Sequence, residues 1–88
     1  GVKMRVYFRD IDDISKGSFV RCDEYDMKDV LNLIKVCRNV DYFQPLVYEK
    51  EDNFLINMYK FVNTEFVLGD AEIGTIDHIN IYIERTNM

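Results

Sequence analysis

The clearest structural signal in this chain is a seven-residue segment, His78-Ile79-Asn80-Ile81-Tyr82-Ile83-Glu84. Isoleucines alternate with polar side chains throughout it, and this period of two is typical of a β-strand with one face in a core. The three isoleucines therefore predict a buried face, and the polar residues predict a face in contact with water. We expect a sheet that contains this strand.

A second alternating segment lies near the other end of the chain. Three apolar residues alternate there with three polar ones, namely Met4, Val6 and Phe8 with Arg5, Tyr7 and Arg9. Residues 10–17 are rich in turn formers, and residues 18–24 then predict a short strand that contains Phe19, Val20 and Cys22. The two strands predict a hairpin with a long loop.

One helix is predicted between Asp26 and Asn39. Asp26 stands at the N-cap, where aspartate is favoured, and Asn39 suits a left-handed position at the C-terminal end. Apolar residues at offsets of three and four predict an inward face made of Met27, Val30, Leu31, Ile34 and Cys37. The outward face is mildly basic and consists of Lys28, Asn32, Lys35 and Arg38.

Residues 46–50 and 54–62 predict further strands, with a turn at 51–53 and a break at Asn63 and Thr64 before a short apolar segment. Gly69 and Gly74 are expected at turn positions that need a permissive backbone. Together the elements predict one α+β domain over residues 1–88, in the order ββαβββ. One main helix would pack on a mostly antiparallel sheet of about five strands, as a two-layer sandwich.

Length and composition limit the class of protein. The chain has 88 residues, of which 48% are hydrophobic, so we expect one core and little room for a deep pocket. Residues 1–3 precede the first methionine, are consistent with an expression remnant, and are left out of the functional argument. The residues expected in the core include five phenylalanines, Phe8, Phe19, Phe54, Phe61 and Phe66.

The cellular setting follows from the cysteines and from hydropathy. Cys22 and Cys37 are expected to be reduced packing residues, since disulfide-dense secreted chains usually carry several pairs. No apolar run is long enough to cross a bilayer. We therefore expect a cytoplasmic protein with no membrane contact, either monomeric or homodimeric.

A strand that runs into Asp10 and Asp12 resembles, over about four residues, the start of haloacid dehalogenase-type phosphotransferases. In that family two aspartates at a strand end serve as nucleophile and general acid. The family also needs a larger parallel sheet and further motifs, which the predicted antiparallel sheet does not offer. We therefore expect these aspartates to form a turn by bonding their own backbone.

Metal, cofactor and catalytic sites are not predicted. The same loop departs from EF-hand spacing, because Ser18 stands where the invariant glycine belongs. The single histidine, His78, is expected to be half-exposed and hydrogen-bonded to a neighbour. We expect no catalytic residues, no metal ligands and no cofactor.

Negative charge is concentrated in the C-terminal third of the chain. No basic residue lies between Lys60 and Arg85, and the formal net charge of the whole chain is −5. An acidic segment of this kind repels phosphate backbones and attracts surfaces rich in lysine and arginine. Tyrosine often anchors protein interfaces. The predicted partner-binding residues are therefore Glu65, Asp70, Glu72, Asp77, Tyr82 and Glu84.

These observations predict a non-enzymatic protein–protein interaction module. The expected partner is a basic, nucleic-acid-binding protein, and no direct contact with nucleic acid is expected. In size and charge the chain is similar to small acidic inhibitors of phage, mobile-element or immunity type, which act by charge mimicry. The alternative is a homo-oligomeric structural or accessory subunit that pairs through an edge strand such as residues 79–84.

Overall fold

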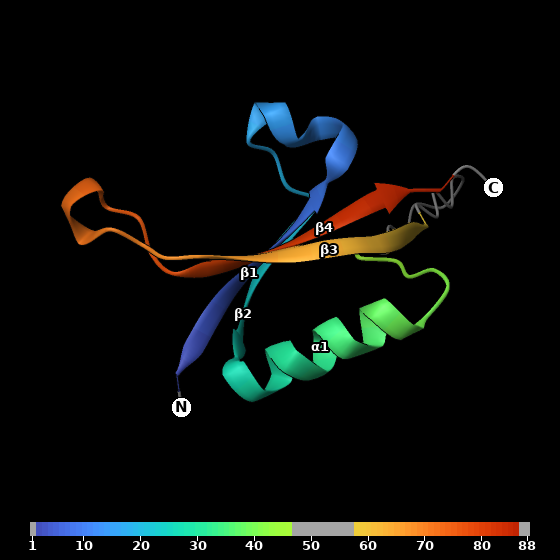
Figure 1. Ribbon diagram of the computed structural model, residues 1–88, viewed down its shortest axis with the longest axis horizontal. Helices are drawn as coiled ribbons and strands as arrows, with labels where there is room; N and C mark the ends of the chain where they lie inside the picture. The colour runs from blue at the N-terminus through green and yellow to red at the C-terminus, as the bar shows by residue number, and fades with distance from the viewer. Residues whose placement is uncertain (1, 47–57, 87–88) are drawn as a thin grey trace, which may run out of the picture.

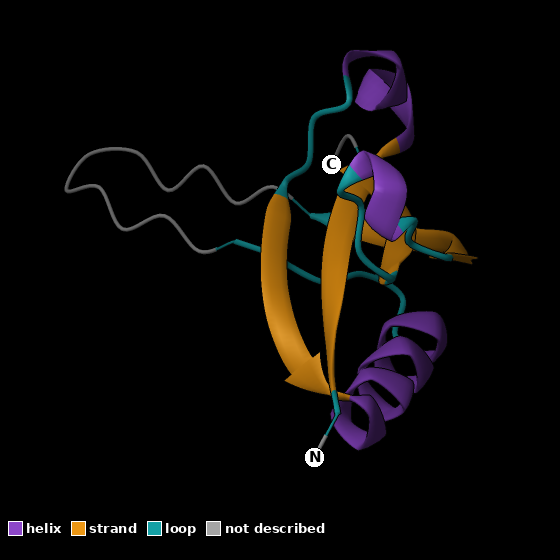
Figure 2. Ribbon diagram, turned by 90° about the vertical axis from the view of Figure 1, so that its left-hand side faces the viewer, coloured by secondary structure: helices purple, strands orange, loops and turns teal. Residues whose placement is uncertain are grey.

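A computed structural model describes residues 2–46 and 58–86 and shows an α+β fold, with one helix packed on a four-stranded mixed sheet. The strands are β1 (Lys3–Asp10), β2 (Arg21–Asp26), β3 (Tyr59–Val67) and β4 (His78–Arg85), in the spatial order β2-β1-β4-β3. The helix α1 (Met27–Asn39) covers one face, while the β1–β2 connection with η1 (Ile11–Lys16) rises from the other side (Figure 1). Figure 2 gives the same arrangement from the end where the β3–β4 connection, with η2 (Ala71–Ile73), projects.

The sheet differs from the predicted one in strand number, and it contains one parallel pair. β1 pairs with β4 in parallel, whereas the β1–β2 and β3–β4 pairs are antiparallel. The prediction of an α+β fold with one helix on a mostly antiparallel sheet is confirmed, since two of the three strand pairs are antiparallel. The predicted number of about five strands and the order ββαβββ are wrong for the described residues, which form four strands in the order ββαββ. The predicted strand at 46–50 lies, apart from Leu46, outside the described residues, and so does the turn at 51–53.

β3 runs through the position where a break was predicted. It passes Asn63 and Thr64 without ending, and its register against β4 shifts between Phe61 and Asn63. An extra residue at such a shift forms a β-bulge, which bends a strand without ending it. The polar pair therefore marks a local irregularity within one strand.

β4 is a central strand. It lies between β1 and β3, so both of its backbone edges are hydrogen-bonded within the sheet. Pairing of two chains through residues 79–84 is therefore excluded, because the edge strands are β2 and β3. The predicted alternation of β4 is confirmed, since Ile79, Ile81 and Ile83 all lie in the core.

The core lies between the sheet and α1. It contains the inward residues of β1 and β4 together with residues of α1 and β3. Within the described ranges these are Met4, Val6, Phe8, Val30, Cys37, Tyr59, Ile79, Ile81 and Ile83. The prediction of a core position is confirmed for Phe8, and Phe61 packs against the core from its edge. Phe19 and Phe66 are exposed, so this prediction is wrong for both. Phe54 lies outside the described residues.

α1 begins where the sequence predicts, but its ends are held by other contacts. Asp26 occupies the N-cap position in an extended conformation, and its side chain makes no capping hydrogen bond. The amide of Met27 instead donates to the carbonyl of Val2 at 3.2 Å. Asn39 does not adopt the predicted left-handed conformation, since no non-glycine residue in the described chain has a positive φ. Its side-chain amide donates to the Lys35 carbonyl at 2.7 Å.

Residues 2 and 3 belong to the fold. Val2 accepts the hydrogen bond from Met27, and Lys3 is paired with Asp26 in the β1–β2 ladder. The backbone of residue 2 completes the junction between β2 and α1.

The inward face of α1 is narrower than the sequence predicts. Val30 and Cys37 are buried and Ile34 is partly buried, whereas Met27 and Leu31 are exposed. Leu31 retains 63% of its accessible surface. The helix therefore leaves part of its apolar arc uncovered.

Candidate protein interface

The connection between β3 and β4 projects from the sheet as an arm made of residues 68–77 (Figure 1). Its conformation is fixed by short-range hydrogen bonds around Asp70. The Asp70 carboxylate accepts from the Glu72 amide at 2.9 Å, and its carbonyl accepts from the amides of Thr75 at 3.0 Å and Ile73 at 3.2 Å. The Asp70 amide donates to the Thr75 hydroxyl at 2.7 Å. The arm is therefore a structured loop.

Two glycines shape the arm for different reasons. Gly74 has a φ of 75°, so the prediction of a position that needs a permissive backbone is confirmed. At Gly69 the constraint is space, because an added Cβ would lie 2.6 Å from backbone atoms of Ile76. The two sides of the arm therefore pass each other closely at its base.

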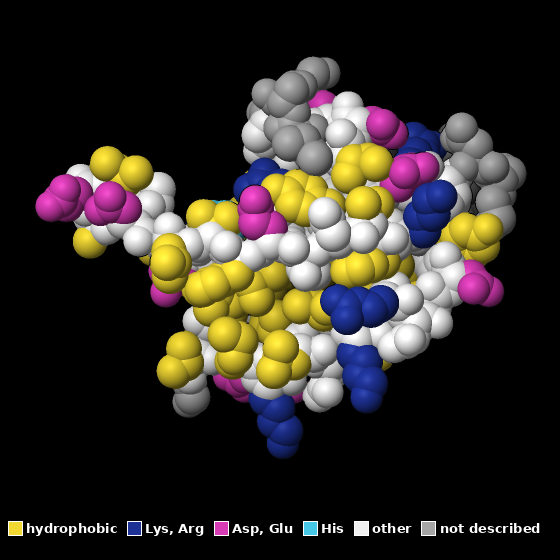
Figure 3. Space-filling view, in the orientation of Figure 1, with side chains coloured by type: hydrophobic (Ala, Val, Ile, Leu, Met, Phe, Trp, Pro, Cys, Tyr) yellow, Lys and Arg dark blue, Asp and Glu magenta, His cyan; other side chains and the backbone are white. Residues whose placement is uncertain are grey.

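The arm presents apolar and acidic side chains together. Residues 70–77 are all exposed, and Leu68, Ile73 and Ile76 retain 74%, 74% and 50% of their accessible surface. Carboxylates and apolar side chains lie side by side at the end of the arm (Figure 3). Mixed apolar and charged surfaces of this kind are typical of sites where proteins bind each other.

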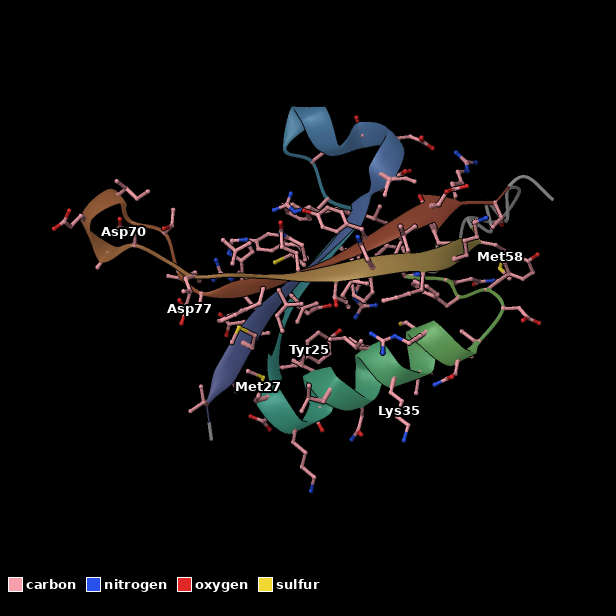
Figure 4. All side chains as sticks on the ribbon, in the orientation of Figure 1. Tyr25, Met27, Lys35, Met58, Asp70 and Asp77 are labelled. Carbon is pink, nitrogen blue, oxygen red and sulfur yellow. The ribbon has the colours of Figure 1, made fainter. Side chains whose placement is uncertain are left out.

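The three carboxylates of the arm lie in two settings. Asp77, at the base, accepts from the Gly69 amide at 2.7 Å. It also lines a cleft of about 400 Å³ together with Lys3, Arg5 and Glu24, so basic groups share its surroundings. Asp70 lies out on the arm, away from the sheet (Figure 4). Asp70 and its neighbour Glu72 are therefore the acidic residues best placed to meet a partner.

A second group of predicted residues forms a polar cluster on the sheet face opposite α1. Asn80 is buried there, and its side-chain amide donates to Oε1 of Glu65 at 2.9 Å. The same Glu65 oxygen accepts from the Tyr82 hydroxyl at 2.8 Å, and Nε of Arg9 donates to Oδ1 of Asn80 at 2.8 Å. We call Arg9, Glu65, Asn80 and Tyr82 the polar cluster. Its four side chains satisfy one another's hydrogen bonds, which is a stabilising arrangement.

Aromatic packing and backbone contacts extend this cluster. The Arg9 guanidinium lies 4.6 Å from the ring centroid of Tyr7 and donates to the carbonyls of Gly17 and Ser18 at 3.2 Å each. The rings of Phe19 and His78 meet the Tyr7 ring edge-on, each at 5.2 Å between centroids. Arg9 therefore ties the β1–β2 connection to the sheet.

His78 has the role that the sequence predicts. It is half-exposed, and its Nδ1 lies 3.0 Å from the Ile76 carbonyl, which it reaches as a donor. Asp10 is also as predicted, because its carboxylate accepts from the Asp12 amide at 3.0 Å within a turn. Among residues 2–46 and 58–86, no three His, Cys, Asp or Glu side chains lie close enough together to hold a metal ion.

The six predicted partner-binding residues thus occupy separate places. Asp70, Glu72 and Asp77 lie on the arm, Glu65 and Tyr82 belong to the polar cluster, and Glu84 forms a 3.6 Å ion pair with Lys60. The structure does not bring all five carboxylates into one surface. The sequence did not predict that Arg9 and Asn80 belong to the site, because strand alternation places both on a water-facing side. Their hydrogen bond depends on the pairing of β1 with β4.

Glu65 should show the effect of the cluster in acid. Hydrogen bonds from Asn80, and next from Tyr82, hold its pKa below the ordinary value. A carboxyl whose pKa is lowered by folding stabilises the protein above the unfolded pKa, near 4.3, and loses this contribution as pH falls through the folded pKa. Tyr82→Phe is therefore expected to raise the pKa of Glu65, as measured by NMR titration of its carboxyl carbon. Tyr42→Phe, outside the cluster, should leave that pKa unchanged, and equal pKa values in the two variants would contradict the prediction.

The fold and the arm together define a small α+β domain with a projecting acidic loop. No helix in the described part of the chain is long and apolar enough to cross a membrane. No protein-family model, curated protein or solved structure matches the chain.

Proposed function

We propose that this protein is a non-enzymatic interaction module that engages a basic, nucleic-acid-binding protein through its arm. In this proposal it acts as an acidic inhibitor, because the carboxylates of the arm occupy lysine and arginine side chains that would otherwise bind phosphate. The observation that carries the proposal is the exposure of Asp70 and Glu72 on an ordered, projecting loop.

Both the charge and the apolar content of the arm support this function. Charged groups steer association and select a partner of opposite sign, whereas buried apolar contacts contribute most of the affinity. The arm supplies Leu68, Ile73 and Ile76 for the second purpose. Its internal hydrogen bonds already order the loop. Binding would therefore cost less conformational entropy.

The sheet carboxylates have a smaller part in this proposal. Glu65 accepts two hydrogen bonds within the polar cluster, and Glu84 is paired with Lys60. Mimicry of phosphate would therefore depend on the arm, and above all on its outer end. This concentrates the predicted site on Asp70, Glu72 and, at the base, Asp77.

Neutralising the outer end of the arm is expected to weaken partner binding on the order of tenfold, or about 1.4 kcal/mol. The test captures proteins from a bacterial lysate on the immobilised chain and identifies them by mass spectrometry. The affinity of a captured protein is then compared for the wild type, Asp70→Asn with Glu72→Gln, and a control with two exposed aspartates changed, Asp12→Asn with Asp41→Asn. The control removes the same amount of charge elsewhere and should bind as the wild type does.

A displacement measurement and a third variant make this test more specific. Labelled nucleic acid should be displaced from the captured protein by the wild type and not by the arm variant. Gly69→Ala keeps every charge but crowds the Ile76 backbone, so it should weaken binding if the shape of the arm matters. Equal binding by the arm variant and its charge-matched control, or no capture of a nucleic-acid-binding protein, would contradict the proposal.

A further inference from the structure

An exposed apolar surface lies between β3 and the first half of α1. The helix contacts β3 near its own C-terminal end, where the Arg38 guanidinium lies 5.4 Å from the Phe61 ring. Its N-terminal end is held at β1 instead, through the hydrogen bond from Met27 to Val2. The two elements therefore diverge, and apolar side chains gather on the open side between them (Figure 3).

We call Met27, Leu31 and Phe66 the apolar surface. Phe66 points to the helix side of the sheet, because its partner in the β4 ladder is the core residue Ile79, yet it retains 55% of its accessible surface. Leu31 is exposed to a similar degree, and Met27 lies at the start of the helix below the sheet (Figure 4). Large exposed apolar side chains on one side of a molecule are typical of surfaces that bind another molecule.

Basic side chains border this surface along the helix. At about 100° per residue, Lys28, Lys35 and Arg38 fall on the same flank of α1 as Leu31, while Asp29 falls on the opposite flank. Arg38 contacts Phe61 and so faces β3. Lys35 and, seven residues before it, Lys28 lie further round, on the side of Leu31 that is directed away from the sheet (Figure 4). The helix therefore presents apolar and basic groups together, with no acidic residue of α1 among them.

The arm is complementary to this flank of α1 in charge and in apolar content. It carries Leu68, Ile73 and Ile76 beside the carboxylates of Asp70 and Glu72. The arm of a chain points away from its own helix, so it cannot cover its own apolar surface (Figure 1). A second copy of the chain offers the matching charge and the matching apolar side chains.

We infer that two copies of this protein form a dimer by exchanging arms. The arm of each chain lies on the apolar surface and the basic flank of the other, about a two-fold axis that makes both contacts at once. This inference goes beyond the proposed function and does not depend on it. The dimer covers the surface through which the arm would bind a partner, so partner and second copy compete for the arm.

Charge reversal with mixing tests this arrangement. The arm variant carries Asp70→Lys and Glu72→Lys, and the helix variant carries Lys28→Glu and Lys35→Glu. When either variant dimerises with itself, like charges face each other. In sedimentation equilibrium the wild type is expected to be dimeric, and each variant alone should dimerise at least roughly tenfold more weakly. An equimolar mixture should recover dimers, because both of its contacts then join opposite charges.

A matched pair of single substitutions tests the apolar part. Leu31→Asp should abolish the dimer, whereas Val36→Asp, an equally exposed position outside the basic flank of the same helix, should leave it intact. Circular dichroism establishes that each variant is folded. A monomeric wild type, a mixture that stays monomeric, or growth into larger assemblies would overturn the inference. These measurements need no partner, so they succeed or fail separately from the lysate experiment.

Discussion

Replacing Ile81 by alanine is expected to lower the free energy of unfolding by about 3 kcal/mol, as measured by urea denaturation. Ile81 is fully buried in the central strand β4, opposite Phe8 of β1 and Thr64 of β3. The substitution removes apolar contacts on both sides and leaves a cavity that neighbouring strands cannot close. Domains of this kind are stable by only about 5–15 kcal/mol, so a large share of the stability would be lost.

The control for this variant is Val36→Ala on α1. Val36 is exposed and lies outside both the core and the apolar surface, so the free energy of unfolding should change by no more than about 0.5 kcal/mol. A loss at Ile81 as small as that at Val36 would show that the centre of the sheet is not the core described here.

Asn80→Leu should cost about 2–3 kcal/mol of unfolding free energy, although it adds an apolar residue to a buried position. The substitution removes the acceptor for Arg9 and the donor for Glu65, at distances of 2.8 and 2.9 Å. Arg9 would then keep a partly buried Nε without its partner, which is costly because hydrogen bonds to charged groups are strong.

Asn63→Leu is the matched control, because Asn63 lies on the same sheet face but is exposed. Its effect should stay within about 0.5 kcal/mol. Combining Asn80→Leu with Glu65→Ala should cost less than the two single effects added together, because both remove the same hydrogen bond. Strict additivity, or a gain in stability at Asn80, would contradict the role of the polar cluster.

The alternation and spacing of apolar residues predicted those strands and helices that have one face in the core and one face in water. The alternation of β1 and β4 and the start of α1 at Met27 are confirmed, because the period of the apolar residues is a property of neighbouring positions. Strand order is not a local property. β1 and β4 pair in parallel, yet an alternating strand has the same sequence pattern in either direction.

The candidate site was only partly predictable for a similar reason. The acidic content of the arm is visible in the sequence, because no basic residue interrupts it. The sequence does not show that Glu65 and Glu84 lie apart from the arm. Their positions depend on the strand pairing that brings Asn80 beside Glu65 and Lys60 beside Glu84. The exposure of Leu31 depends on the oblique crossing of α1, which a helical pattern does not specify.

The parallel pairing at the centre of the sheet has a consequence for how the chain folds during synthesis. Arg9 and Asn80, which join across β1 and β4, are 71 residues apart. Closing so long a loop costs more entropy than forming either antiparallel pair, and folds that depend on distant pairings form slowly. On the ribosome, the apolar face of β1 stays without its main neighbour until β4 has been made. We therefore expect the nascent chain to lack a complete core until residues 78–85 have left the exit tunnel.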